Sequence, residues 1–219
     1  MNIDQQTKVS IIWIGIISCW LFFVLEIVTD FWFGSKFPGY NWQQESISYL
    51  GQSNSPVEQW VMIWGVIFCV LLVFYAISFY QSLKSQNWVR IAVACLVTYA
   101  IGEGLGSGIF PINPPNTPVT IDARLHNIFS GIGDAGLILF PFVLMLIFPK
   151  KDNYRFHLYL WSVVVIGIIM ASLFLAAKYY HPDNSITQFK GVWQRVYLLN
   201  YHSLLLVVSF KMIFLKTNN

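Results

Sequence analysis

The sequence predicts an all-α membrane protein, a compact bundle of six transmembrane helices with both termini in the cytoplasm. Of its 219 residues, 56% are hydrophobic and only 11% are charged. Soluble proteins carry about 25% charged residues, so this chain has too little charge to cover a surface that faces water. It also contains six apolar runs long enough to cross a hydrocarbon core about 30 Å thick.

Apolar continuity places all six spans in a single domain, residues 1–219. The expected spans are residues 10–33, 56–83, 87–110, 122–148, 155–179 and 192–215. The first is too long for a signal peptide and ends without a small-residue cleavage site, so it is retained. The second begins with a proline and a capping box, Ser55 to Glu58. Four prolines in residues 110–118 separate the third span from the fourth, and Pro141 is expected to kink the fourth.

The distribution of Lys and Arg orients the bundle, because cytoplasmic loops carry an excess of these residues. Eight of the 13 lie in the terminal segments, the 2–3 loop and the 4–5 loop, and five lie on the other side. We therefore expect a multi-pass protein of the bacterial cytoplasmic (inner) membrane. No basic run suggests nucleic acid. The expected partners are membrane lipids and a small-molecule or lipid ligand, and the oligomeric state stays open.

Ionisable residues inside the spans give the strongest functional signal, since such residues usually face a bundle interior or a water-filled cavity. A rise of about 1.5 Å per residue places six of them, from four spans, in one layer near the outer face. They are Glu26, Glu103, His126, Asp134, Arg195 and His202. Spacing of four residues adds Ser107 to the face of Glu103, and Ser130 to the face shared by His126 and Asp134.

Glycines explain how this layer could assemble. Two GxxxG pairs, Gly102/Gly106 and Gly104/Gly108, surround Glu103, and the fourth span offers Gly131, Gly133 and Gly136. Small residues at this spacing allow helix backbones to approach closely. We therefore expect the third and fourth spans to pack tightly and to carry Glu103 and the His126/Asp134 face into one outward-facing pocket, which His202 also approaches.

The favoured interpretation is a pocket that binds a small polar molecule or a lipid head group. In this interpretation Arg195, with His126 and His202, holds an anionic head group, while Glu103 and Asp134 accept hydrogen bonds. The segment of residues 45–51 is expected to cover the pocket through Glu45, Ser46 and Ser48.

Two alternatives use the same residues. In the first, a membrane-embedded hydrolase of lipid amides or esters binds zinc through His126, Asp134 and His202, with Glu103 as the base. In the second, Glu26, Glu103 and Asp134 are the protonatable sites of a proton-coupled transporter. A serine triad ranks below the zinc site, because no GxSxG motif marks a nucleophile among Ser46, Ser107 and Ser130. Whether the protein is an enzyme stays open.

Three motifs resemble those of a prokaryotic membrane family, in the same order and spacing. They are "ESISYLG" (45–51), "GSGIFPIN" (106–113) and "RLHNIFSGIGD" (124–134). The chain resembles the family called domain of unknown function 998 over about residues 10–215, which implies a compact bundle of six or seven helices. The matching positions are Ser46, Ser48, Gly51, Gly108, Phe110, Pro111 and His126, while the acidic residue that usually follows the "FP" of the family's second motif appears in this chain as Asn113. The family has no established activity, so no catalytic role is carried over. A looser similarity to ceramidase-like membrane hydrolases is fold-level analogy.

Overall fold

Six helices of the computed structural model are long and apolar enough to cross a membrane. The structure describes residues 3–115, 117–178 and 184–217, and these residues are helical or looped, with no strand among them. The six spans are Val9–Lys36, Glu58–Leu83, Val89–Ile109, Ile121–Ile147, Tyr154–Ala176 and Lys190–Phe214. The all-α class and the number of spanning helices predicted from the sequence are thus confirmed.

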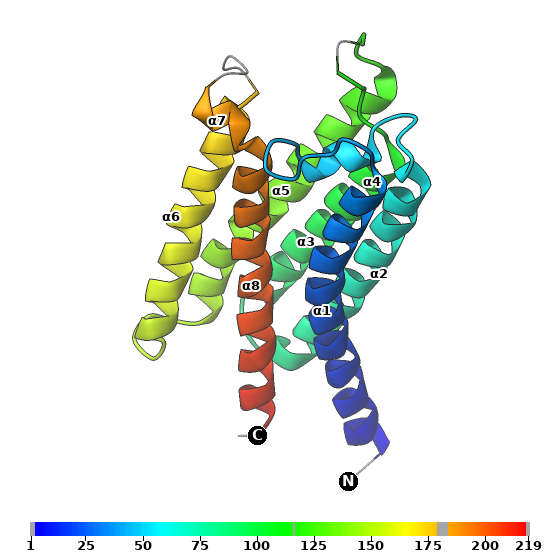
Figure 1. The fold of residues 1–219 in the computed structure, drawn as a ribbon. Coiled ribbons are helices and arrows are strands. Elements are labelled where there is room, and N and C mark those ends of the chain that lie inside the picture. The colour runs from blue at the N-terminus through cyan, green and yellow to red at the C-terminus, as the bar shows by residue number, and fades with distance from the viewer. Residues whose placement is uncertain (1–2, 116, 179–183, 218–219) are drawn as a thin grey trace.

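The long helices are α1 (Ile3–Lys36), α2 (Glu58–Leu83), α3 (Val89–Tyr99), α5 (Ile121–Ile147), α6 (Tyr154–Ala176) and α8 (Lys190–Thr217). The short ones are the 3-10 helix η1 (Ile47–Gly51), the π-helix η2 (Ala100–Gly106), α4 (Ser107–Ile109) and α7 (Ser185–Gln188). The third span is made of α3, η2 and α4 in succession. Figure 1 shows both chain ends at one end of the bundle and η1 and α7 at the other.

The start of the second span differs from the prediction. Helix α2 begins at Glu58 rather than at Pro56. The Ser55 hydroxyl accepts a hydrogen bond from the backbone N–H of Val57, and the Glu58 carboxylate accepts one from the N–H of Asn54. The predicted capping residues therefore stabilise a turn that precedes the helix. Further along the chain, α5 continues through Pro141 from Ile121 to Ile147.

Glycines bring the backbone of the third span against two neighbouring helices. A Cβ atom added to Gly102 would lie 2.6 Å from Gly133 Cα in α5, which confirms the expected close packing of the third and fourth spans. A Cβ atom added to Gly65 in α2 would lie 2.3 Å from the carbonyl oxygen of Gly104 and 3.1 Å from Gly108 Cα. The second glycine pair thus packs against α2 rather than α5, a contact that the sequence analysis missed.

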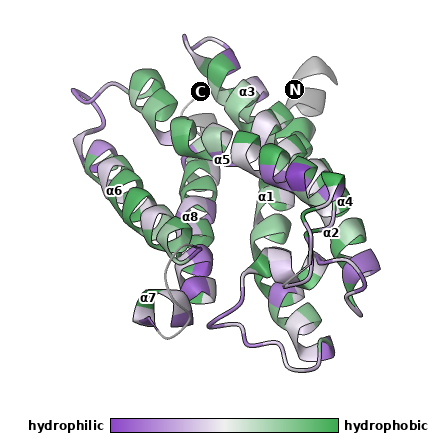
Figure 2. Cartoon of the chain, turned by 90° about the horizontal axis from the view of Figure 1, so that it is seen from above, coloured by the Kyte–Doolittle hydropathy of each residue, from purple (hydrophilic) through white to green (hydrophobic). Residues whose placement is uncertain are grey.

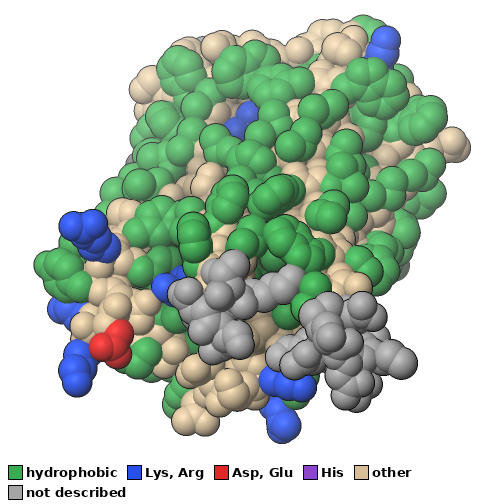
Figure 3. Space-filling model, turned by 90° about the horizontal axis from the view of Figure 1, so that it is seen from below, with side chains coloured by type: hydrophobic (Ala, Val, Ile, Leu, Met, Phe, Trp, Pro, Cys, Tyr) green, Lys and Arg blue, Asp and Glu red, His purple; other side chains and the backbone are tan. Residues whose placement is uncertain are grey.

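Large hydrophobic side chains cover the outside of the helices, as expected for a surface in contact with lipid. Seen from the end opposite the termini, hydrophilic residues gather in the loops and the adjoining helix ends (Figure 2). Seen from the end that carries the termini, the charged side chains are mainly Lys and Arg among a largely hydrophobic surface (Figure 3). This end is the one that the Lys and Arg count assigns to the cytoplasm.

Candidate functional site

A cavity of about 770 Å³ lies in the half of the bundle away from the termini, and all six spans contribute to its wall. Six of the eight binding residues suggested by the sequence line it, namely Glu26, Glu103, Ser107, His126, Ser130 and Asp134. Arg195 and His202 instead line a smaller, neighbouring cavity of about 210 Å³ between α1 and α8. Glu26 contributes to both walls.

Glu103 lies in the π-helix η2, where the glycines leave room for α2 and α5 on either side. Both of its carboxyl oxygens accept hydrogen bonds. Ser130 of α5 donates to Oε1, and Ser107, one turn further along the third span, donates to Oε2 at 2.9 Å. Insertions of π-helix into a helix occur frequently at functional sites. The two serines orient the Glu103 carboxyl group within the cavity.

The other two cavity carboxyl groups each accept a hydrogen bond from a neutral donor. The Trp64 indole N–H donates to Glu26 Oε2 at 2.9 Å, and the Tyr197 hydroxyl donates to Asp134 Oδ1 at 2.8 Å. Both carboxyl groups lie within electrostatic range of Glu103. Within the part of the chain that the structure describes, none of the three forms an ion pair. The cavity therefore contains three carboxyl groups that form no ion pair among those residues.

His126 is only 6% exposed, although its position in the sequence suggested a residue near the membrane rim. Its Nδ1 lies 2.9 Å from the carbonyl oxygen of Ser107 and 2.8 Å from that of Phe110. A carbonyl oxygen can only accept a hydrogen bond, so Nδ1 must be the donor and must carry a proton. In the neutral ring Nε2 is then an acceptor, and it has no hydrogen-bond partner among the described residues. His126 thus offers one more acceptor on the cavity wall.

Two lysines also line the cavity, and the sequence analysis counted them only as charges outside the membrane. Lys190 is the first residue of α8 and Lys178 lies two residues beyond the end of α6. Lys178 is close enough to interact electrostatically with both Lys190 and Asp134. Neither ammonium group forms a hydrogen bond or an ion pair with any residue in 3–115, 117–178 and 184–217. In the sequence, Lys178 lies near the end of the fifth span and Lys190 near the start of the sixth. These positions could have identified the two lysines as neighbours.

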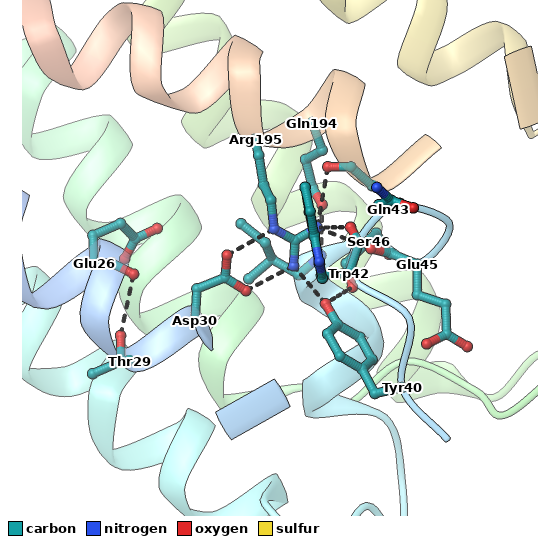
Figure 4. Close-up of polar contacts among 12 residues, drawn as sticks. Glu26, Thr29, Asp30, Tyr40, Trp42, Gln43, Glu45, Ser46, Gln194 and Arg195 are labelled. Carbon is teal, nitrogen blue, oxygen red and sulfur yellow. Dashed lines mark hydrogen bonds and ion pairs between the residues drawn. The ribbon is translucent and has the colours of Figure 1, made fainter. Parts of the chain in front are cut away.

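Arg195 does not have the free donors that a head-group site requires (Figure 4). Its Nε and Nη2 donate to the two carboxylate oxygens of Asp30, each at 2.8 Å, and Nη2 also donates to the Tyr40 hydroxyl at 2.6 Å. Its Nη1 donates to the carbonyl oxygens of Trp42 and Glu45 at 2.7 and 3.0 Å. All five N–H groups are engaged within the chain. These contacts leave Arg195 no free donor for the anionic head group expected from the sequence, and they hold the 1–2 loop instead.

We call this group the Arg195 clamp, comprising Arg195, Asp30, Tyr40 and the carbonyl groups of Trp42 and Glu45. Burial raises the pKa of Tyr40 to about 12, with nearby Arg195 lowering it in part. The Tyr40 hydroxyl therefore stays protonated, and it donates to the carbonyl oxygen of Ser46 at 3.3 Å. Since Asp30 closes the ion pair from α1, the clamp joins α1, the 1–2 loop and α8. Asp30 is not among the site residues suggested by the sequence.

Two of the three residues expected to cover the pocket line the cavity, and the third makes a different contact. Ser46 and Ser48 line the cavity, and the Gln194 side chain of α8 accepts a hydrogen bond from the Ile47 N–H at 2.7 Å. The Glu45 carboxylate instead accepts a hydrogen bond from the Asn41 N–H at 2.8 Å, outside the cavity wall. The segment thus forms part of the cavity wall next to the clamp.

His202 is only 3% exposed and lies away from the other zinc candidates. Its Nε2 is 2.6 Å from the Tyr99 hydroxyl, and its ring packs edge-on against Phe22 at 4.8 Å between centroids. The prediction that His202 shares a cavity with Glu103 and Asp134 is therefore wrong. Among the described residues, no group of three or more His, Cys, Asp or Glu side chains is placed to hold a metal ion. The zinc site suggested by the sequence is not assembled, because the α8 face that carries His202 meets α1 rather than α5.

Comparison with known proteins identifies a family but no characterised relative. The sequence model of a family described as protein of unknown function (DUF998) matches residues 14–211. No curated protein and no solved structure matches the chain.

Proposed function

The chain belongs to the DUF998 family of proteins of unknown function, and we propose that its cavity binds the polar head group of a lipid or a small polar molecule. The observation that carries this proposal is a cavity of about 770 Å³ whose wall carries several carboxyl and ammonium groups that form no ion pair among the described residues. Pockets for small ligands typically measure about 300–1,000 Å³ and combine apolar walls with a few polar groups. The protein would act as a multi-pass protein of the bacterial cytoplasmic membrane, with the cavity facing outward.

The wall of the cavity suits an amphipathic ligand. Its apolar part comes from α2, α5 and α6, including Phe68, Ile138 and Phe174, and its polar part comes from the carboxyl groups, His126 and the loop cover. A ligand with both characters would contact both parts of the wall. Zinc-dependent hydrolysis is not proposed further, since the three residues expected to bind the metal are not together.

Blocking the cavity tests the proposal. Ala135 lines the cavity, whereas Ile132 on the same helix is 50% exposed and lies outside the cavity wall. Native mass spectrometry of gently purified protein should show a bound lipid or small molecule in the wild type and in Ile132→Trp. The adduct should be lost in Ala135→Trp, because the indole would fill the site. An adduct that persists in Ala135→Trp, or none in the wild type, would contradict ligand binding in the cavity.

Cysteine labelling tests the proposed orientation. The native residues Cys19, Cys69 and Cys95 are buried, so they should give little background. Asn54→Cys, at an exposed position beside the loop cover, should react with an impermeant maleimide in intact cells. Gln86→Cys, exposed in the 2–3 loop, should react only after lysis. The opposite pattern would reverse the orientation. Asn116, another position of interest for labelling, lies outside the described residues.

A further inference from the structure

The deep part of the cavity offers hydrogen-bond acceptors. The carboxyl groups of Glu26, Glu103 and Asp134 lie well inside their spans, and each accepts a hydrogen bond from a neutral donor and forms no ion pair among the described residues. Lys178 is within electrostatic range of Asp134 but does not pair with it. His126 is only 6% exposed, and its Nε2 atom is a further acceptor with no hydrogen-bond partner in the part of the chain that the structure describes. A ligand group that donates several hydrogen bonds suits such a wall, and a positive charge on that group would favour ionised carboxyl groups around it. An ammonium group has three donors and no acceptor.

The outer part of the same cavity has the opposite character. Lys178 and Lys190 come from the facing ends of α6 and α8 and lie close enough to interact electrostatically. Two like charges held near each other are unfavourable unless an anion or solvent lies between them. Neither forms an ion pair in the described residues, although Lys178 lies within electrostatic range of Asp134 and Lys190 within that of Glu45. The outer wall therefore suits a phosphate or carboxylate group.

We propose that the cavity selects a zwitterionic ligand, with an ammonium group at Glu103, Asp134 and His126 and a phosphate group between Lys178 and Lys190. This inference rests on the proposed function and names its ligand class. The chemistry is that of phosphoethanolamine, either as the head group of a phospholipid or as a free molecule. A purely anionic ligand would leave the carboxyl groups unpaired, and a purely cationic one would leave the lysines unpaired.

Binding measured with three probes tests this inference. Phosphatidylethanolamine carries both charges, phosphatidylglycerol carries only the phosphate, and free phosphoethanolamine carries the head-group charges without acyl chains. The wild type should bind phosphatidylethanolamine at least about tenfold more tightly than phosphatidylglycerol, a difference of about 1.4 kcal/mol. Competition by free phosphoethanolamine would support a soluble ligand of this chemistry, and its failure to compete would support the lipid.

Charge-neutralising variants separate the two ends of the cavity. Glu103→Gln with Asp134→Asn should reduce the preference for phosphatidylethanolamine to less than about threefold, because the acceptors lose their charge. Lys178→Met with Lys190→Met should weaken both phospholipids together. Lys150→Met with Lys151→Met, at exposed positions near the other end of the bundle, is the matched control and should change neither affinity. Thermal unfolding of each variant verifies that it is folded.

The outcomes distinguish this inference from the function on which it rests. Equal or tighter binding of phosphatidylglycerol by the wild type would overturn the zwitterion site, and so would a preference that survives in the carboxyl variant. If that binding still disappears in Ala135→Trp, the cavity remains a head-group site of a different selectivity. Binding that Ala135→Trp does not affect would overturn both.

Discussion

Arg195→Met is expected to lower the free energy of unfolding by about 3–5 kcal/mol, the usual cost of removing one partner from a buried ion pair. The Arg195 and Asp30 side chains are only 12% and 7% exposed. The substitution would leave the Asp30 carboxylate without its cation, and it would also leave the Tyr40 hydroxyl and two loop carbonyl groups without their donor. Thermal or denaturant unfolding in detergent measures the effect.

Arg124→Met is the matched control, because Arg124 is exposed in the first turn of α5. Surface substitutions of this kind usually change stability by less than about 0.5 kcal/mol. The double variant Asp30→Leu/Arg195→Met should be more stable than Arg195→Met, since it removes the unpaired charge along with its partner. If Arg195→Met unfolds at the same point as Arg124→Met, the clamp does not stabilise the cover.

Gly65→Ala is the second substitution expected to have a large effect. The added Cβ would lie 2.3 Å from the carbonyl oxygen of Gly104 and 3.1 Å from Gly108 Cα, and both are backbone atoms that cannot rotate away. Overpacking of this kind costs about 1–3 kcal/mol, occasionally more. We therefore expect a lower unfolding midpoint and a displaced η2, the segment that carries Glu103.

Gly131→Ala provides the contrast, since no atom lies within 4 Å of a Cβ added there. Alanine is favoured over glycine in helices by about 1 kcal/mol, so this variant should be as stable as the wild type or more so. Both variants make the same chemical change within a helix. Equal unfolding midpoints for Gly65→Ala and Gly131→Ala would show that α2 and η2 do not touch as described.

The number of spans was predictable because an apolar run of about 20 residues has no other stable environment. Helical phase was also informative within one helix. Ser130 and Asp134 do line the same cavity, and Arg195 and His202 do share a face of α8. Helical phase shows which residues share a face of one helix, but it does not show which neighbouring helix that face contacts. The α8 face with Arg195 and His202 meets α1, while Tyr197 reaches Asp134 of α5.

The π-helix and the clamp were beyond sequence reasoning for different physical reasons. Glycines near Glu103 indicated close packing, but a change of helix type depends on contacts with both neighbours at once, here Gly65 and Gly133. Asp30 sits near a span end, where an acidic residue is unremarkable until its partner is known. That partner, Arg195, is 165 positions away in the sequence.

The most direct test of the cavity as a ligand site is an experimental structure of the wild-type protein in nanodiscs that contain phosphatidylethanolamine and phosphatidylglycerol. We predict density that no side chain accounts for, inside the cavity lined by Glu103, His126 and Asp134 and extending to Lys178 and Lys190. A well-resolved cavity that holds only water, or one closed by a different packing of α5 and α6, would contradict the account.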